Sequence, residues 1–192
     1  MPVGSCESLL TLSTQCKMIP LIENRTQLAR VLDTRSIKAI FLRHCNLFEL
    51  AGTLEHIQKR KIAVYVGIDH IDGIHADNAG LQYLAHTLRI QGIISSHPRT
   101  LALAKTLGLE TIQRIFALDS TGMETALESV DSASVDLLDI SPALVIPHIT
   151  TKLQGLRPFI ASGLIQTTQQ MHTVLHAGAI SVVVARDELW TQ

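Results

Sequence analysis

The sequence has few aromatic residues, few cysteines and no long apolar run, and each shortage excludes a class of protein. Aromatic residues make up 4% of the 192 residues, too few to indicate a stacking platform for bases. The three cysteines are an odd number without CxxC spacing, which argues against a disulfide framework and a zinc ribbon. No stretch reaches the roughly 18 apolar residues of a membrane helix, and no secretory signal begins the chain. We expect a cytoplasmic protein with no membrane contact, no metal and no other cofactor.

Charge is balanced and apolar content is high. The chain has 16 Lys and Arg against 17 Asp and Glu, and 46% of its residues are hydrophobic. Such a chain can bury a sizeable core, and its composition excludes intrinsic disorder. A net charge near zero offers no general attraction to a polyanion, so a role with RNA requires a local basic patch.

From residue 18 onward, short runs of Ile, Val, Leu and Ala alternate with segments of helical periodicity, as in repeated βα units. The expected strands are 18–22, 39–43, 62–69, 92–95, 111–117, 135–140, 158–161 and 180–185. The expected helices are 25–32, 47–58, 77–89, 98–107, 122–129, 147–153 and 168–176, followed by a short turn at 187–190. Residues 1–17 show no clear period, so we expect a flexible amino-terminal arm before one domain over 18–192.

Eight units without a break in composition predict an α/β fold, a compact (βα)8 TIM-like barrel, although such barrels usually have about 250 residues. The alternative is an open doubly wound sheet. That fold would need a Gly-rich phosphate loop after its first strand, and residues 19–24 read IPLIEN. We therefore favour the barrel.

In a barrel, polar residues near the carboxyl ends of the strands indicate the functional face. Period-two alternation points Asp69 inward at the rim of the third strand, and Ser95 ends the fourth. Arg114 lies within the fifth strand, where a buried guanidinium needs an acidic partner. That partner is an internal carboxylate, Asp69 or Asp139, or a bound phosphate or carboxylate.

Two further groups of residues suggest anion binding, at opposite ends of the predicted barrel. Barrels often bind phosphate after the seventh and eighth strands, which here gives the candidates Ser162, Gly163, Ala185 and Arg186. The basic run Lys59, Arg60 and Lys61 precedes a strand and so belongs to the amino-terminal face. Such cations complement helix carboxyl termini, which explains the run without a ligand, and RNA contact is the alternative.

Five stretches of the chain resemble the glycerol-3-phosphate-responsive antiterminators of the glycerol uptake operon. They are VGIDHIDGI at 66–74, GIISS at 92–96, AKTLGL at 104–109, IQRIFALDS at 112–120 and PFIASGLI at 158–165. The resemblance extends over about residues 18–190. It implies a short (βα)8 barrel that binds glycerol 3-phosphate, contacts an mRNA leader and catalyses no reaction.

The resemblance also implies roles for particular residues. Asp69 and Arg114 become ligand-pocket residues, Asp139 stands where the family pattern has an acid, and the phosphate loop falls on Gly163 and on Ala185 and Arg186. Two departures touch that loop. Ser162-Gly163 replaces a usual pair of glycines, and Ala185-Arg186 replaces small hydroxyl residues. Arg186 could restore affinity through its charge, or the ligand could be a similar small phosphorylated compound.

We therefore predict an RNA-binding transcription antiterminator that senses glycerol 3-phosphate and regulates genes of glycerol uptake and metabolism. Its partners would be that ligand, an mRNA leader and, as an open alternative, further copies of itself. A barrel enzyme with Asp69 as general base on a small phosphorylated substrate is the competing hypothesis. A barrel that acts only through protein partners is the third.

Overall fold

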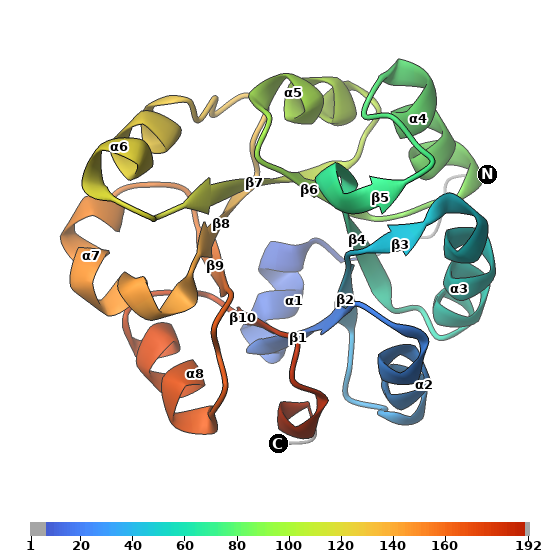
Figure 1. Cartoon of the computed structure of the whole chain (residues 1–192), viewed down its shortest axis with the longest axis horizontal. Helices are drawn as coiled ribbons and strands as arrows, with labels where there is room; N and C mark the ends of the chain where they lie inside the picture. Colours follow the sequence, from blue (N-terminus) through green and yellow to red (C-terminus); the bar gives the residue numbers. More distant parts are fainter. Residues whose placement is uncertain (1–6, 191–192) are drawn as a thin grey trace.

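The computed structural model describes residues 7–190, and eight parallel strands in it form a closed barrel with helices outside (Figure 1). The TIM-like barrel predicted from the sequence is confirmed. Around the barrel the strand order is β1-β10-β9-β8-β7-β6-β4-β2. The strands are β1 (Met18–Ile22), β2 (Ala39–Leu42), β4 (Ala63–Gly67), β6 (Gly92–Ser95), β7 (Glu110–Phe116), β8 (Leu137–Ser141), β9 (Phe159–Ser162) and β10 (Val182–Val184).

Helices alternate with these strands, and most begin close to their predicted positions. They are α2 (Arg25–Asp33), α3 (Leu47–Lys59), α4 (Asn78–Gln82), α5 (Pro98–Thr106), α6 (Ser120–Glu128), α7 (Ile146–Leu153) and α8 (Thr168–His176). The predicted helix 77–89 changes at Tyr83 into a π-helical turn, Tyr83–Thr87. Two short strands that the sequence did not indicate, β3 (Cys45–Asn46) and β5 (Ile71–Asp72), pair beside the barrel. No helix described in the range 7–190 is long and apolar enough to span a bilayer.

Strand alternation divides the core into two layers. In β4, Val64 and Val66 pack outward against the helices, whereas Ala63 and Tyr65 point into the barrel. The interior is filled by apolar side chains from nearly every strand, so the barrel is a packed core rather than a pore. Toward the carboxyl-terminal mouth the inward side chains become polar, as at Arg114 and Asp139.

The amino-terminal end of the barrel is closed by α1 (Leu9–Gln15), which lies across the ring of strands (Figure 1). Leu9 and Leu12 are buried in the interior layer. The Leu9 amide donates to both carboxylate oxygens of Glu110, at 3.1 and 3.0 Å, and the Tyr65 hydroxyl donates to Glu110 Oε2 at 2.6 Å. The structure thus differs from the flexible arm expected over 1–17, of which residues 1–6 lie outside the described part.

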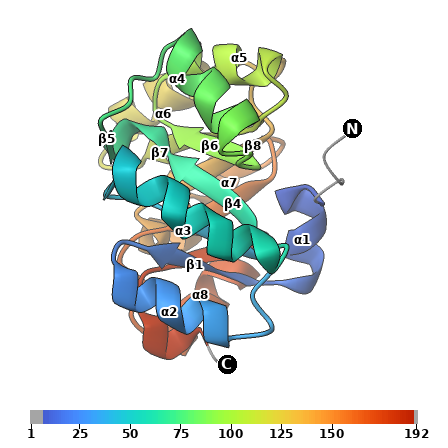
Figure 2. The same cartoon turned by 90° about the vertical axis from the view of Figure 1, so that its right-hand side faces the viewer.

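The helices begin at the mouth end of the barrel and end at the end that α1 closes (Figure 2). The side chains of Asn24, Asp119 and Thr167 each accept a hydrogen bond from an amide of the first helical turn. Gly108 and Gly178, which follow helices, have φ of 79° and 108°. This arrangement places the first turns of the helices, together with the strand ends, around the mouth.

Candidate ligand site at the barrel mouth

An ion pair between Arg114 and Asp139 lies inside the mouth. The two residues are register partners in β7 and β8. Ile112 and Leu137, two residues earlier on the same strands, belong to the barrel interior, so Arg114 and Asp139 point inward as well. The Arg114 side chain is 7% exposed and that of Asp139 is fully buried. Of the partners that the sequence left open for Arg114, the structure shows Asp139.

Only one oxygen of the Asp139 carboxylate is satisfied within the described chain. Nε and Nη2 of Arg114 both lie 2.8 Å from Oδ2. Oδ1 is buried and accepts no hydrogen bond from any residue between 7 and 190. A buried acceptor without a donor costs free energy, so this atom indicates a place for a donor that the chain does not supply.

Asp69 follows β4 within a 3-10 turn, Ile68–His70, and it is held by the end of β6. Ser95 Oγ donates to Oδ1 at 2.7 Å, and the Ser96 amide donates to Oδ2 at 2.8 Å. Ser95 Oγ in turn accepts from the His97 amide at 3.1 Å. The structure therefore brings Asp69 and Ser95 together, and both carboxylate oxygens already have donors. This geometry suits a fixed acceptor better than a general base that must take a proton from substrate.

Four residues near the mouth form a charged group that the predicted site omitted. Arg43 donates to Glu23 Oε1 from Nη2 at 2.7 Å and from Nε at 3.2 Å. His44 adopts φ of 55°, and its ring lies 5.2 Å from that of His70 between centroids. Burial lowers the pKa of His70, and the positive charges of Arg114, His44 and Arg43 lower it further. The charge of Arg114 therefore acts on the His70 ring across the mouth.

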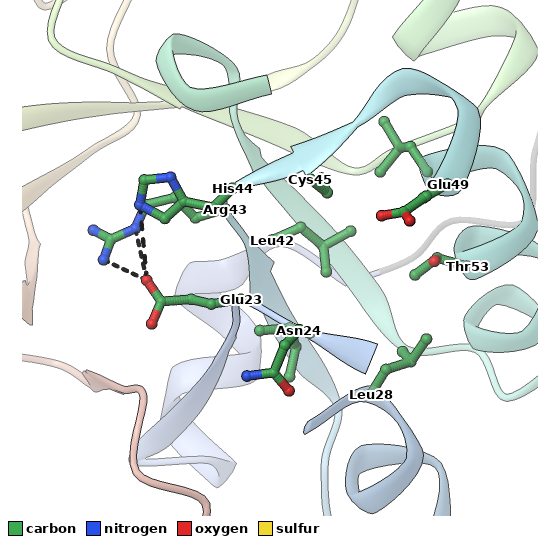
Figure 3. A pocket seen from close by; sticks show the side chains of 11 residues that line it. Glu23, Asn24, Leu28, Leu42, Arg43, His44, Cys45, Glu49 and Thr53 are labelled. Carbon is green, nitrogen blue, oxygen red and sulfur yellow. Dashed lines mark hydrogen bonds and ion pairs between the residues drawn. The ribbon is translucent and has the colours of Figure 1, made fainter. Parts of the chain in front are cut away.

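A small cavity opens between this group and α3 (Figure 3). Its volume is about 50 Å³, and its walls include Glu23, Arg43, His44 and Cys45. Burial raises the pKa of the Cys45 thiol to about 11, which keeps it protonated and unreactive at neutral pH. The space is sufficient for water but too small for a triose phosphate. The larger hollow, of about 420 Å³, lies at the other end of the barrel beside Leu10 and Glu110.

The predicted phosphate residues lie after β9 and β10, further round the same rim. Ser162 is buried, and Gly163 has φ of 86° with its α-carbon hydrogen facing Ser141; a Cβ there would lie 3.0 Å from Ser141 Oγ. The Ala185 carbonyl accepts from Gln27 Nε2 at 2.8 Å. Arg186 is half exposed, with Nε 3.8 Å from Glu188 Oε2. No hydrogen bond or ion pair given for the described residues joins these four to Arg114 or Asp139.

Strand order sets the mouth residues side by side. Asp69 follows β4 and Ala185 follows β10, whereas Ser95, Arg114, Asp139 and Ser162 lie within the successive strands β6, β7, β8 and β9 between them. In Figure 2 α3 runs from the mouth end toward the end where α1 lies; Lys59 is its last residue, and Arg60 and Lys61 follow it there. The strand ends at the mouth thus carry a buried guanidinium paired with a carboxylate and, further round the rim, a glycine at positive φ.

Comparison with known proteins agrees with this reading of the fold. The family model described as glycerol-3-phosphate responsive antiterminator matches residues 18–190. A glycerol uptake operon antiterminator regulatory protein from Listeria monocytogenes has a similar structure, with a TM-score of 0.84 and 24% identity over 91% of this chain and 94% of that one. An antiterminator-related protein from Thermotoga maritima gives 0.81 and 23%, over 92% and 99%.

One curated sequence is also similar over nearly its whole length. The uncharacterized protein YgcP of Escherichia coli (strain K12) is 23% identical over 186 residues, which cover 95% of this chain and 96% of the relative. At 23% and 24% identity the two solved structures support only the fold of this chain. Membership of a family is shown instead by the family model, which matches residues 18–190.

Proposed function

The chain belongs to the glycerol-3-phosphate responsive antiterminator family, and from this premise we propose that it is a regulator that binds glycerol 3-phosphate at the barrel mouth and acts on an mRNA leader. The observation that supports ligand binding is Oδ1 of Asp139, which lies beside the buried Arg114 and has no donor in the described part of the chain. A ligand with hydroxyl groups and a phosphate would satisfy both. One hydroxyl would donate to Oδ1, and the guanidinium would attract the phosphate.

The remaining mouth residues have complementary roles in this proposal. Gly163 turns at a positive φ and leaves room for Ser141 Oγ beside its backbone, so it would support the phosphate through its backbone amide. Arg186 at the rim adds positive charge where the family pattern has a hydroxyl. Asp69, fixed by Ser95 and Ser96, holds the ends of β4 and β6 and presents a negative edge that selects against a second phosphate.

The proposed activity needs no chemical step. Binding energy from the mouth would shift the protein toward the form that engages RNA, and the size of that shift is limited by the difference in ligand affinity between the two forms. Regulation of glycerol uptake and metabolism genes is the biological outcome that fits a glycerol 3-phosphate sensor.

Isothermal titration calorimetry tests the ligand half. We expect saturable binding of glycerol 3-phosphate, and much weaker binding of glycerol or inorganic phosphate alone, because each offers only half of the contacts. The double variant R114M/D139L removes both charges and should remain folded without binding. An affinity for glycerol 3-phosphate unchanged in that variant would refute the site. Turnover of a triose phosphate that is lost in D69N would instead assign the barrel to an enzyme.

A further inference from the structure

Three neighbouring loops at the amino-terminal end of the barrel concentrate positive charge. Residues 34–38, 58–62 and 87–91 hold six of the 16 Lys and Arg residues and no Asp or Glu. The corresponding loops at 107–110, 129–136, 154–158 and 177–181 have one cation, Arg157, and three acids, Glu110, Asp131 and Asp136. The charge on this face is therefore polarised, although the whole chain is nearly neutral.

Hydrogen bonds hold the three loops together. Arg60 Nη2 donates to the Thr34 carbonyl at 3.4 Å, which joins the loop after α3 to the loop after α2. Gln58 Nε2 donates to the Leu88 carbonyl at 2.6 Å, which joins it to the loop before β6. Lys59 is already paired with Glu55 at 2.9 Å. We call the other five cations, Arg35, Lys38, Arg60, Lys61 and Arg89, the basic strip.

Two members of the basic strip sit in strained backbone conformations. Lys61 and Arg89 have φ of 56° and 52°, in the left-handed region that disfavours side chains with a Cβ. The same kind of turn, after a helix and before a strand, is made by Gly108, Gly155 and Gly178 elsewhere on this face. Glycine would serve the backbone equally well at 61 and 89. Strain that persists in a native fold suggests that the side chain has a use, and both side chains are exposed cations.

We propose that the basic strip holds the sugar-phosphate backbone of RNA, on the face opposite the ligand mouth. This inference rests on the proposed function, in which the protein acts on an mRNA leader, so the polyanion that meets the strip is RNA. Spaced cations on rigidly joined loops suit successive phosphates, and the low aromatic content favours backbone contact over base stacking. Figure 2 shows the consequence: α1 lies at the end of the barrel that carries the strip, and β5 lies at the mouth end. Ligand and RNA would thus bind at opposite ends of one barrel.

The test replaces each strained cation with glycine. Its probe is an RNA unrelated to the glycerol operon. Fluorescence anisotropy would measure binding of a short labelled hairpin RNA by wild type, K61G and R89G at several KCl concentrations between about 50 and 200 mM. The slope of log K against log salt should fall by about 0.7 to 0.9 in each variant, one phosphate contact apiece. The melting temperature should be unchanged or up to about 4 °C higher, because glycine relieves the left-handed strain.

R99A is the matched control, since Arg99 is an exposed cation in the first turn of α5, at the mouth end. It should leave the salt slope unchanged. If RNA still binds and the salt slopes of K61G and R89G are unaltered, the basic strip is not the RNA contact, and the proposed function stands without it. A fall in melting temperature would show that the two side chains serve packing and would also overturn it.

Two outcomes concern the partner. If wild type binds no RNA with or without glycerol 3-phosphate, the RNA half of the proposed function fails, and the strip fails with it. If phosphatidylglycerol vesicles bind instead, with a loss in K61G and R89G, the strip belongs to a membrane surface and the RNA assignment is overturned.

Discussion

Arg114 and Asp139 face each other across β7 and β8, and two guanidinium nitrogens share one carboxylate oxygen at 2.8 Å, while the other oxygen has no hydrogen-bond donor among residues 7–190. A pair placed only for stability would be expected to engage both oxygens. That oxygen is buried, so a ligand hydroxyl would reach it only if the side chains that cover it moved. Because α1 closes the opposite end, the mouth is the end at which a ligand can meet this pair.

Removal of Arg114 alone should destabilise the fold strongly. R114M leaves the Asp139 carboxylate buried without its cation, which costs about 3–5 kcal/mol, whereas R114M/D139L should recover most of that loss. Urea denaturation of the two variants measures the difference. Equal stability of R114M and wild type would show that water or another residue already compensates Asp139.

The pKa of His70 should rise when an anion binds at the mouth. In the free protein, burial and the charges of Arg114, His44 and Arg43 lower this pKa, whereas the charge of Asp69 raises it. The negative charge of a bound phosphate would counter the three positive charges and so raise the pKa of His70. An NMR titration of the His70 ring with and without glycerol 3-phosphate measures the change, with glycerol as the uncharged control and H70N to assign the resonance. An unchanged pKa in the saturated complex would place the phosphate away from His70.

Leu9 should contribute more to stability than its neighbour Leu10. L9A removes a fully buried side chain from the barrel interior and should cost about 2–5 kcal/mol. L10A removes a side chain that is 47% exposed and should change stability by at most about 0.5 kcal/mol. Thermal melting of both variants compares them directly. Similar melting temperatures would mean that α1 is not firmly docked in solution.

Glu110 should make stability fall as pH rises. Burial raises the pKa of its carboxyl, despite hydrogen bonds from Tyr65 and Leu9 that oppose the shift. The folded protein therefore binds more protons than the unfolded chain between the ordinary glutamate pKa and the raised one, and stability is lost as pH increases through that window. E110Q cannot ionise, so its stability relative to wild type should improve from pH 4 to pH 7. The opposite trend in denaturation midpoints would contradict the raised pKa.

Strand periodicity was enough to predict the barrel and the burial of Arg114, because a residue's side of a strand depends only on local alternation. It was not enough for Asp69, because β4 ends at Gly67 and Asp69 lies exposed in the 3-10 turn that follows. The partner of Arg114 depends on how β7 and β8 align, and that register is set by closure of the whole barrel, so the sequence left two acids open. The first helix gave little signal because it has seven residues, several of them Ser or Thr. Its position depends on the contact between Leu9 and Glu110, 101 residues apart.

Glu23, Arg43 and His44 were missed for a different reason. They follow β1 and β2, and the rule that polar residues at strand ends mark the working face applies to them as it does to Asp69. Applied to every strand, the rule would have found them. The strained φ of His44 and the contact of Arg43 with Glu23 are visible only in the folded chain.

A crystal structure of the protein with glycerol 3-phosphate tests the central claim most directly. The account predicts the ligand in the barrel mouth, with one hydroxyl within hydrogen-bonding distance of Asp139 Oδ1 and the phosphate on the side of Arg114. A ligand bound in the hollow beside α1, or one in the mouth that leaves Oδ1 without a donor, would contradict it.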